Sequence, residues 1–132
     1  MKCLIVEDDL ISRRILKEQL SSLCDCDIAI NGEEAIVSFR MAHEGKRPYD
    51  LICMDIMMPG IDGQEALLRI REMEKAMGIS PCLEVKVIMT TALDDPHTVV
   101  QAFYKGGATS YIVKPISKQK LINEIRQFGL IN

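Results

Sequence analysis

The sequence predicts an α/β fold: a doubly wound, five-stranded parallel sheet in the order 2-1-3-4-5, with helices on both faces. Short apolar runs alternate with longer amphipathic segments five times along the 132 residues. The apolar runs are continuous, which is typical of strands covered on both faces. The segments between them are too long for hairpins, so the strands are expected to be parallel. Right-handed crossovers in one short domain, residues 1–132, favour this strand order.

Each expected strand is a short apolar run closed by polar or turn-forming residues. The first strand ends at Glu7, the second at the turn dipeptide Asn31-Gly32, and the third at Asp55. The fourth strand ends at Thr91 and the fifth at Lys114. The strands are expected at residues 3–6, 28–30, 51–54, 85–89 and 111–113.

The helices are predicted from amphipathic spacing and from residues that start or end a helix. In the first helix, Ile11, Ile15, Leu16 and Leu20 fall near one face, which is expected to pack on the sheet. The last helix begins after Ser117, a residue type that caps helices well. The helices are expected at residues 10–21, 33–43, 64–77, 95–106 and 117–128.

Composition and charge exclude several classes of protein. A net charge of −3 disfavours a general nucleic-acid binder. The apolar runs fall far short of the roughly 20 residues that a membrane span needs, and the N-terminus does not resemble a signal peptide. The five cysteines include no C-x-x-C pair, which favours reduced thiols and a cytoplasmic location. A metal site formed by Cys24, Cys26 and His43 is a weaker alternative.

Reactive side chains collect where the predicted strands end. Glu7 and Asp8 follow the first strand, and Asp55 follows the third. These strands are neighbours in the predicted order, so the three carboxylates should meet at one edge of the sheet. They would repel one another without a cation, and hard oxygen ligands suit Mg²⁺. Together with the ammonium of Lys114 and the hydroxyl of Thr91, they predict a site that accepts a phosphoryl group on an aspartate.

Taken in order, these motifs resemble the signature of response-regulator receiver domains, the CheY-like domains of two-component signalling. The motifs are Glu7-Asp8, Asp55, Thr91-Ala92 and Lys114-Pro115, with the loop 58–63 after Asp55. The resemblance extends from Lys2 to about Phe128. It implies a flavodoxin-like (βα)5 fold and a single receiver, or phosphoacceptor, domain over residues 1–132.

The resemblance implies a role for each site residue. Asp55 would be the phosphoacceptor, and Thr91 and Lys114 would contact the phosphoryl group. Tyr111 would turn inward when Thr91 moves, and the Lys114-Pro115 bond would be cis. The implied Mg²⁺ ligands are Glu7, Asp8, Asp55 and the backbone carbonyl of Met57.

The resemblance also implies how the protein would act. A stand-alone receiver would take its phosphoryl group from a sensor histidine kinase or a histidine phosphotransfer protein. It would then signal to a protein target through the face formed by the fourth helix, fifth strand and fifth helix, a face that could also dimerise. It would not be an enzyme beyond its own phosphoryl transfer and autodephosphorylation. Alternatives are a receiver within a longer response regulator or hybrid kinase, or a phosphorelay intermediate.

Three other classes of protein are alternatives on a similar fold. A phosphohydrolase resembling the haloacid dehalogenases would need a second Asp at the position of Met57. A flavodoxin-like flavin carrier would need a Ser-, Thr- and Gly-rich loop where Glu7-Asp8-Asp9 stands. A receiver-like module that never takes phosphate is disfavoured by the intact acidic site.

Two connections depart from the pattern of the receiver family. The segment between Asp55 and Thr91 is longer than usual, and the excess is expected around residues 75–84. A further extra residue lies in Gly106-Gly107-Ala108 or in residues 93–96, which affects the register of the fourth helix. Neither departure alters the acidic residues, Thr91 or Lys114.

Overall fold

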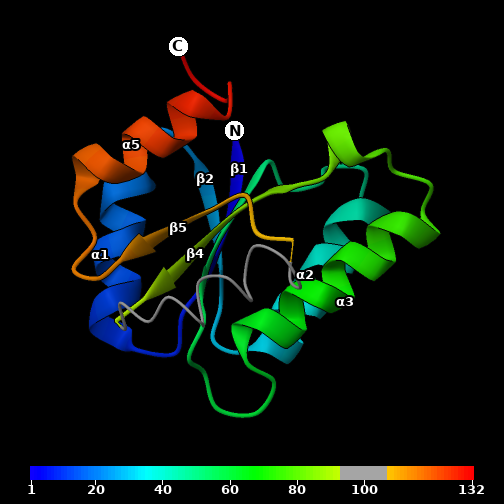
Figure 1. Ribbon diagram of the computed structural model, residues 1–132, viewed down its shortest axis with the longest axis horizontal. Helices are drawn as coiled ribbons and strands as arrows, with labels where there is room; N and C mark the ends of the chain where they lie inside the picture. Colours follow the sequence, from blue (N-terminus) through cyan, green and yellow to red (C-terminus); the bar gives the residue numbers. More distant parts are fainter. Residues whose placement is uncertain (93–106) are drawn as a thin grey trace.

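The computed structural model describes residues 1–92 and 107–132, which contain a five-stranded parallel sheet in the order β2-β1-β3-β4-β5 (Figure 1). The strands are β1 (Lys2–Val6), β2 (Asp25–Ala29), β3 (Leu51–Asp55), β4 (Lys86–Thr91) and β5 (Ser110–Val113). The helices are α1 (Leu10–Leu20), α2 (Gly32–Glu44), α3 (Gly63–Ala76) and α5 (Lys118–Gln127). The predicted fold class and strand order are confirmed. The helix expected over residues 95–106 lies outside the described residues.

The helices cover the sheet from both sides. Figure 1 shows α1 and α5 on one face and α2 and α3 on the other. β3 is buried at all of its positions, because side chains from both helical layers pack against it. This two-sided burial explains why the central strands read as continuous apolar runs.

β2 is the strand whose bounds the sequence prediction missed. It pairs with β1 over five residues, from Lys2 opposite Asp25 to Val6 opposite Ala29. Because β2 is an edge strand, Asp25, Asp27 and Ile28 face solvent, and such positions accept charged residues. Asp27, for example, accepts a hydrogen bond of 2.7 Å from the Tyr49 hydroxyl. A search for apolar residues therefore found only the second half of the strand.

Each described α-helix begins at a side-chain cap. Asn31 lies in the bend that closes β2, as expected, and it also accepts a hydrogen bond from the backbone N–H of Glu34 and caps α2. Asp9 accepts from the N–H of Ser12 at 2.9 Å and caps α1. The four caps are Asp9, Asn31, Asp62 and Ser117. Losing such a cap typically costs about 1 kcal/mol.

The prediction that Ile11 and Ile15 face the core was wrong. Leu16 and Leu20 are buried, but Ile11 is 69% exposed and Ile15 is 43% exposed. Ile15 precedes Leu16 by one residue, so it lies about 100° around the helix from the buried stripe. The start of α1 therefore presents an apolar surface beside the carboxyl edge of the sheet.

Two other expectations from composition can be compared with the fold. Among the described residues, no helix has the length and apolar character needed to cross a membrane. All five cysteines are free thiols. Cys24, Cys26 and His43 do not gather as metal ligands, so this weaker alternative is not supported.

Candidate functional site

Three carboxylates gather at the carboxyl edge of the sheet. Glu7, Asp8 and Asp55 each offer an oxygen, and these oxygens all lie within 4.8 Å of one another. β1 and β3 pair side by side, with Val6 opposite Met54, so the acids that follow these residues emerge together. Glu7 is fully buried, Asp55 is nearly buried and Asp8 is exposed. The strand order thus brings the three acids together as the sequence led us to expect.

Lys114 reaches this acidic cluster from the end of β5, an edge strand of the sheet. It follows β5, and its backbone N–H donates to the Thr91 carbonyl at 2.7 Å. Its Nζ lies 2.5 Å from Oε1 of Glu7 and 3.2 Å from Oδ2 of Asp55. The Lys114-Pro115 peptide bond is cis, as expected. One ammonium therefore bridges acids that come from two different strands.

The charges of this cluster are only partly balanced. Burial, followed by the hydrogen bond with Asp55, raises the pKa of Glu7 to about 7, and the contact with Lys114 opposes this rise. Burial alone would lower the pKa of Lys114, but Glu7 and Asp55 raise it above its usual value. The Lys114 ammonium contacts Glu7 and Asp55, and Asp8 lies beside them on the exposed side of the cluster. A cluster of carboxylate oxygens whose negative charge Lys114 offsets only in part fits a divalent cation such as Mg²⁺.

The loop after β3 fixes the Asp55 side chain. The backbone N–H of Met57 donates to Oδ1 of Asp55 at 3.1 Å, while Lys114 contacts the other oxygen. The chain then turns back, and the N–H of Gly63 donates to the Ile56 carbonyl at 2.9 Å. A Cβ at Gly63 would lie 2.2 Å from the Asp55 carbonyl oxygen. One end of this loop therefore holds the Asp55 carboxylate, and the other end packs against the Asp55 backbone carbonyl.

The remaining predicted site residues occupy β4, β5 and the loop. Thr91 is the buried last residue of β4, and its strand partner is Val113. Tyr111 is partly buried and packs against the core on the α2–α3 side. The Met57 side chain is largely exposed. The roles of these residues stay predictions.

The sequence analysis did not identify two arginines whose side chains donate hydrogen bonds to backbone carbonyls near the sheet. Arg13 of α1 donates from Nη1 to the Glu7 carbonyl at 3.2 Å, which braces the loop that carries Glu7 and Asp8. Arg71 of α3 bonds the carbonyl of Gly107, the residue at which the described chain resumes. Arginines on amphipathic helices normally suggest solvated surface. Only the fold reveals these backbone partners.

The fold and its acidic edge define the class of protein as a receiver. The family model described as the response regulator receiver domain matches residues 3–126. The chain belongs to this family of two-component signalling domains.

Relatives of different lengths carry this domain. The two-component response regulator ORR41 of Oryza sativa is 33% identical over 130 residues, covering 98% of this chain and 95% of that protein. The transcriptional regulatory protein ResD of Bacillus subtilis is 37% identical over 126 residues, covering 95% of this chain. The chain spans only 46% of ResD, and only 5% of the histidine kinase mak2 of Schizosaccharomyces pombe.

Solved structures show the same fold. The receiver domain of Ssk1 from Saccharomyces cerevisiae, crystallised with the phosphotransfer protein Ypd1, has a TM-score of 0.85 at 28% identity, covering 98% of this chain and 89% of that chain. A CheX–CheY complex with BeF₃ and Mg²⁺ from Borrelia burgdorferi has a TM-score of 0.83 at 27% identity, covering 100% of this chain and 90% of that chain.

Proposed function

We propose that this receiver takes a phosphoryl group on Asp55 from a phosphohistidine of a partner protein in a Mg²⁺-dependent reaction. A carboxylate oxygen of Asp55 would form the new bond to phosphorus. The N–P bond would break, and the histidine nitrogen would keep the electron pair and take up a proton. The observation that carries this proposal is the placement of Asp55 beside both the ammonium of Lys114 and the acids Glu7 and Asp8.

Glu7, Asp8 and Asp55 are the residues that would hold Mg²⁺, with the Met57 carbonyl as a further ligand. When bound, Mg²⁺ would offset the negative charge of the transferred phosphoryl group. Lys114 would pair with one phosphoryl oxygen through a charge-assisted hydrogen bond. The Met57 N–H, which already donates to Oδ1 of Asp55, would hold the carboxylate in position for attack.

Phosphorylation would then act as a conformational switch. It adds a charge of roughly −1.5 to −2 together with strong acceptor oxygens. The hydroxyl of Thr91 would move to donate to one of these oxygens, and Tyr111 on the neighbouring strand would follow. Such a movement would change the face that β5 and α5 form with the expected fourth helix. That face would then bind a target protein or a second copy of the chain.

The relatives support more than one setting for this receiver. Coverage of nearly all of ORR41 favours a stand-alone regulator. Partial coverage of ResD and mak2 keeps open a receiver within a longer regulator or hybrid kinase. Autodephosphorylation, a cytoplasmic location and a phosphorelay role belong to the same proposal in either setting.

Labelling with a small phosphodonor tests the proposed chemistry. We expect the chain, incubated with acetyl phosphate and Mg²⁺, to gain one phosphoryl group in intact-mass spectra, and peptide mapping to place it on Asp55. Removing Mg²⁺ with a chelator should suppress the product, because the carboxylates then repel the donor. Undiminished labelling in the chelator would contradict the role of the metal. A chain that takes no label at all would contradict the proposed function.

The partner's histidine requires a docking surface beside Asp55, and the start of α1 offers one. Leu10 is 51% exposed and Ile11 is 69% exposed. A groove next to them is lined by Ser12, Ile15, Lys114, Pro115 and Ile116. Because Lys114 contacts Asp55, a protein seated in this groove would bring its histidine to the phosphoacceptor. We therefore assign the groove to a histidine-bearing domain of a kinase or phosphotransfer protein.

Changing Ile11 to Glu separates docking from chemistry. We expect this change to slow phosphotransfer from phosphorylated Ypd1 by about tenfold or more, since a charge replaces an apolar contact. The rate with acetyl phosphate, which needs no docking surface, should fall far less. Met41→Glu, at a similarly exposed apolar position on α2, is the matched control. If Ile11→Glu slows phosphotransfer from Ypd1 and labelling by acetyl phosphate equally, the change damages the fold or the site rather than docking.

A further inference from the structure

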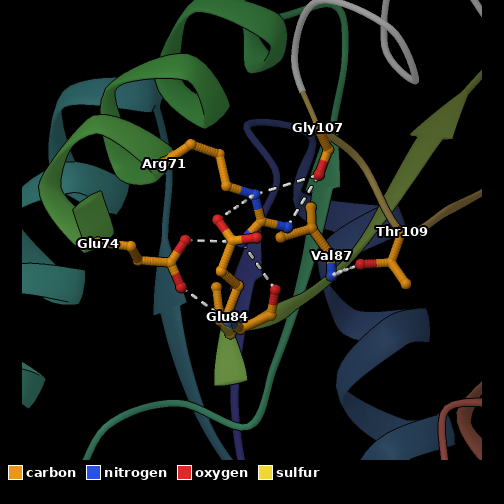
Figure 2. Close-up of polar contacts among 7 residues, drawn as sticks. Arg71, Glu74, Glu84, Val87, Gly107 and Thr109 are labelled. Carbon is orange, nitrogen blue, oxygen red and sulfur yellow. Dashed lines mark hydrogen bonds and ion pairs between the residues drawn. The ribbon is translucent and has the colours of Figure 1, made fainter. Parts of the chain in front are cut away.

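A second polar cluster lies at the amino end of β5, far along the strand from Lys114. Figure 2 shows Arg71 of α3 at its centre. Nε and Nη2 of Arg71 donate to the Gly107 carbonyl at 3.1 and 2.9 Å. Nη1 donates to the Val85 carbonyl at 2.9 Å and to Oε1 of Glu74 at 2.7 Å. One guanidinium thus joins α3, the start of β4 and the chain that leads into β5.

Glu74 fixes the orientation of this guanidinium. Its side chain is 1% exposed, and its second oxygen accepts from the Val85 N–H at 2.7 Å. Both carboxylate oxygens are therefore bonded, as a buried charge requires. Glu84 adds a longer contact of 3.9 Å to Arg71. The planar guanidinium can serve these partners at once, which the single ammonium of a lysine cannot do in the same geometry.

Gly107 is shaped to meet Arg71. Its φ of +72° lies in the left-handed region that glycine adopts without strain. A Cβ at this position would stand 3.3 Å from Nε of Arg71. Glycine therefore permits both the turn of the chain and the close approach of its carbonyl to the guanidinium.

These contacts hold the start of an edge strand. β5 pairs only with β4, because it is the last strand of the sheet. Just before β5, the Thr109 N–H donates to the Val87 carbonyl and its hydroxyl accepts from the Val87 N–H, both at 2.9 Å. At the other end, Lys114 reaches Glu7 and Asp55. β5 has four residues, so only this short strand separates the Thr109 contacts from Lys114.

We propose that Arg71 is a positioning residue of the phosphoryl site. By holding the Gly107 carbonyl, it fixes the start of β5 and thereby the place of Lys114 against Asp55. This inference rests on the proposed function, because it requires that Lys114 pairs with the phosphoryl group. Arg71 itself lies away from the reacting atoms and acts through β5.

The test measures labelling by acetyl phosphate and Mg²⁺ in Arg71→Met and in Arg69→Met. Arg69 lies on the same helix, is half exposed and forms only the surface pair with Glu65 among the contacts of the described chain. We expect Arg71→Met to lower the labelling rate at saturating donor by roughly threefold to tenfold, since a displaced lysine pairs poorly with the phosphoryl group. Arg69→Met should stay within about twofold of the wild-type rate.

A double-mutant cycle shows whether Arg71 acts through Lys114. We expect Arg71→Met to change the rate by less than about twofold when Lys114 is already Met, because coupled residues are non-additive. An equal loss in both backgrounds would overturn the inference, as would a wild-type rate in Arg71→Met. Rates are compared at temperatures where urea unfolding shows each variant to be folded. Arg71→Lys, which keeps a charge beside Glu74, replaces Arg71→Met in the same cycle if the latter does not fold.

The outcomes for the inference and for the proposed function are distinguishable. A wild-type chain without label, or an equal label on Asp55→Asn, overturns the proposed function and this inference with it. A wild type labelled on Asp55 together with an unaffected Arg71 variant overturns only the inference.

Discussion

Asp55→Asn is expected to abolish phosphoryl labelling by acetyl phosphate. The amide oxygen carries no negative charge and is a poor nucleophile toward phosphorus, while the amide NH₂ cannot take the place of a metal-binding oxygen. Asn is nearly the size of Asp, so the contacts around position 55 should persist. Intact mass after a fixed incubation, with and without Mg²⁺, gives the labelled fraction for each protein.

Asp62→Asn is the matched control for this change. Asp62 lies in the same loop, and its Oδ1 accepts a hydrogen bond of 2.9 Å from the Glu65 N–H at the start of α3. Because Asn caps helices as well as Asp does, this variant should fold and take label like the wild type. If Asp55→Asn takes as much label as the wild type, the phosphoacceptor is another residue. Loss of label in both variants would point to disruption of the loop.

Gly63→Ala is expected to destabilise the fold strongly, although it adds only a single methyl group. The new Cβ would stand 2.2 Å from the Asp55 carbonyl oxygen and 2.9 Å from Cε of Met89. The backbone oxygen cannot rotate away, so the loop or the end of β3 must shift. We expect a loss of about 1–3 kcal/mol in the free energy of unfolding, or more. Urea unfolding monitored by circular dichroism measures it.

Gly45→Ala separates this clash from the general effect of replacing glycine. Gly45 follows α2, and a Cβ there meets nothing closer than the Met41 carbonyl at 3.4 Å. Its unfolding free energy should stay within about 0.5 kcal/mol of the wild type. Gly63→Ala should also label more slowly, because the shift moves the backbone of Asp55. Equal stability of the two variants would mean that the loop relaxes without cost.

The position of the site was predictable because its residues follow the carboxyl ends of successive strands in the repeated strand–helix units. Glu7, Asp55 and Lys114 each lie where a strand ends, and parallel strands end at one edge. Strand order then follows from the handedness of the crossovers. The burial of β1 and β3 on both faces gives continuous apolar runs, so these strands were the easiest to find.

The errors have physical causes as well. At β2, an edge position lets Asp25 and Asp27 stand in a strand, so hydrophobicity no longer signals it. On α1, Ile11 and Ile15 are apolar but exposed, and apolarity alone cannot tell a buried face from an exposed one. The spacing of apolar residues gives the buried face of a helix to within one or two residues. The layer that packs against the helix decides which of those residues are buried.

By itself, the sequence determined the strand order and the edge at which Glu7, Asp8, Asp55 and Lys114 would meet, because local patterns and parallel topology suffice for that. Only the tertiary structure decided what surrounds them. The long connection before β4 supplies the Val85 carbonyl and Glu84, and Gly107 before β5 supplies its own carbonyl. Arg71 binds both segments. No periodic pattern in the sequence predicts these contacts, because they join residues far apart in the chain.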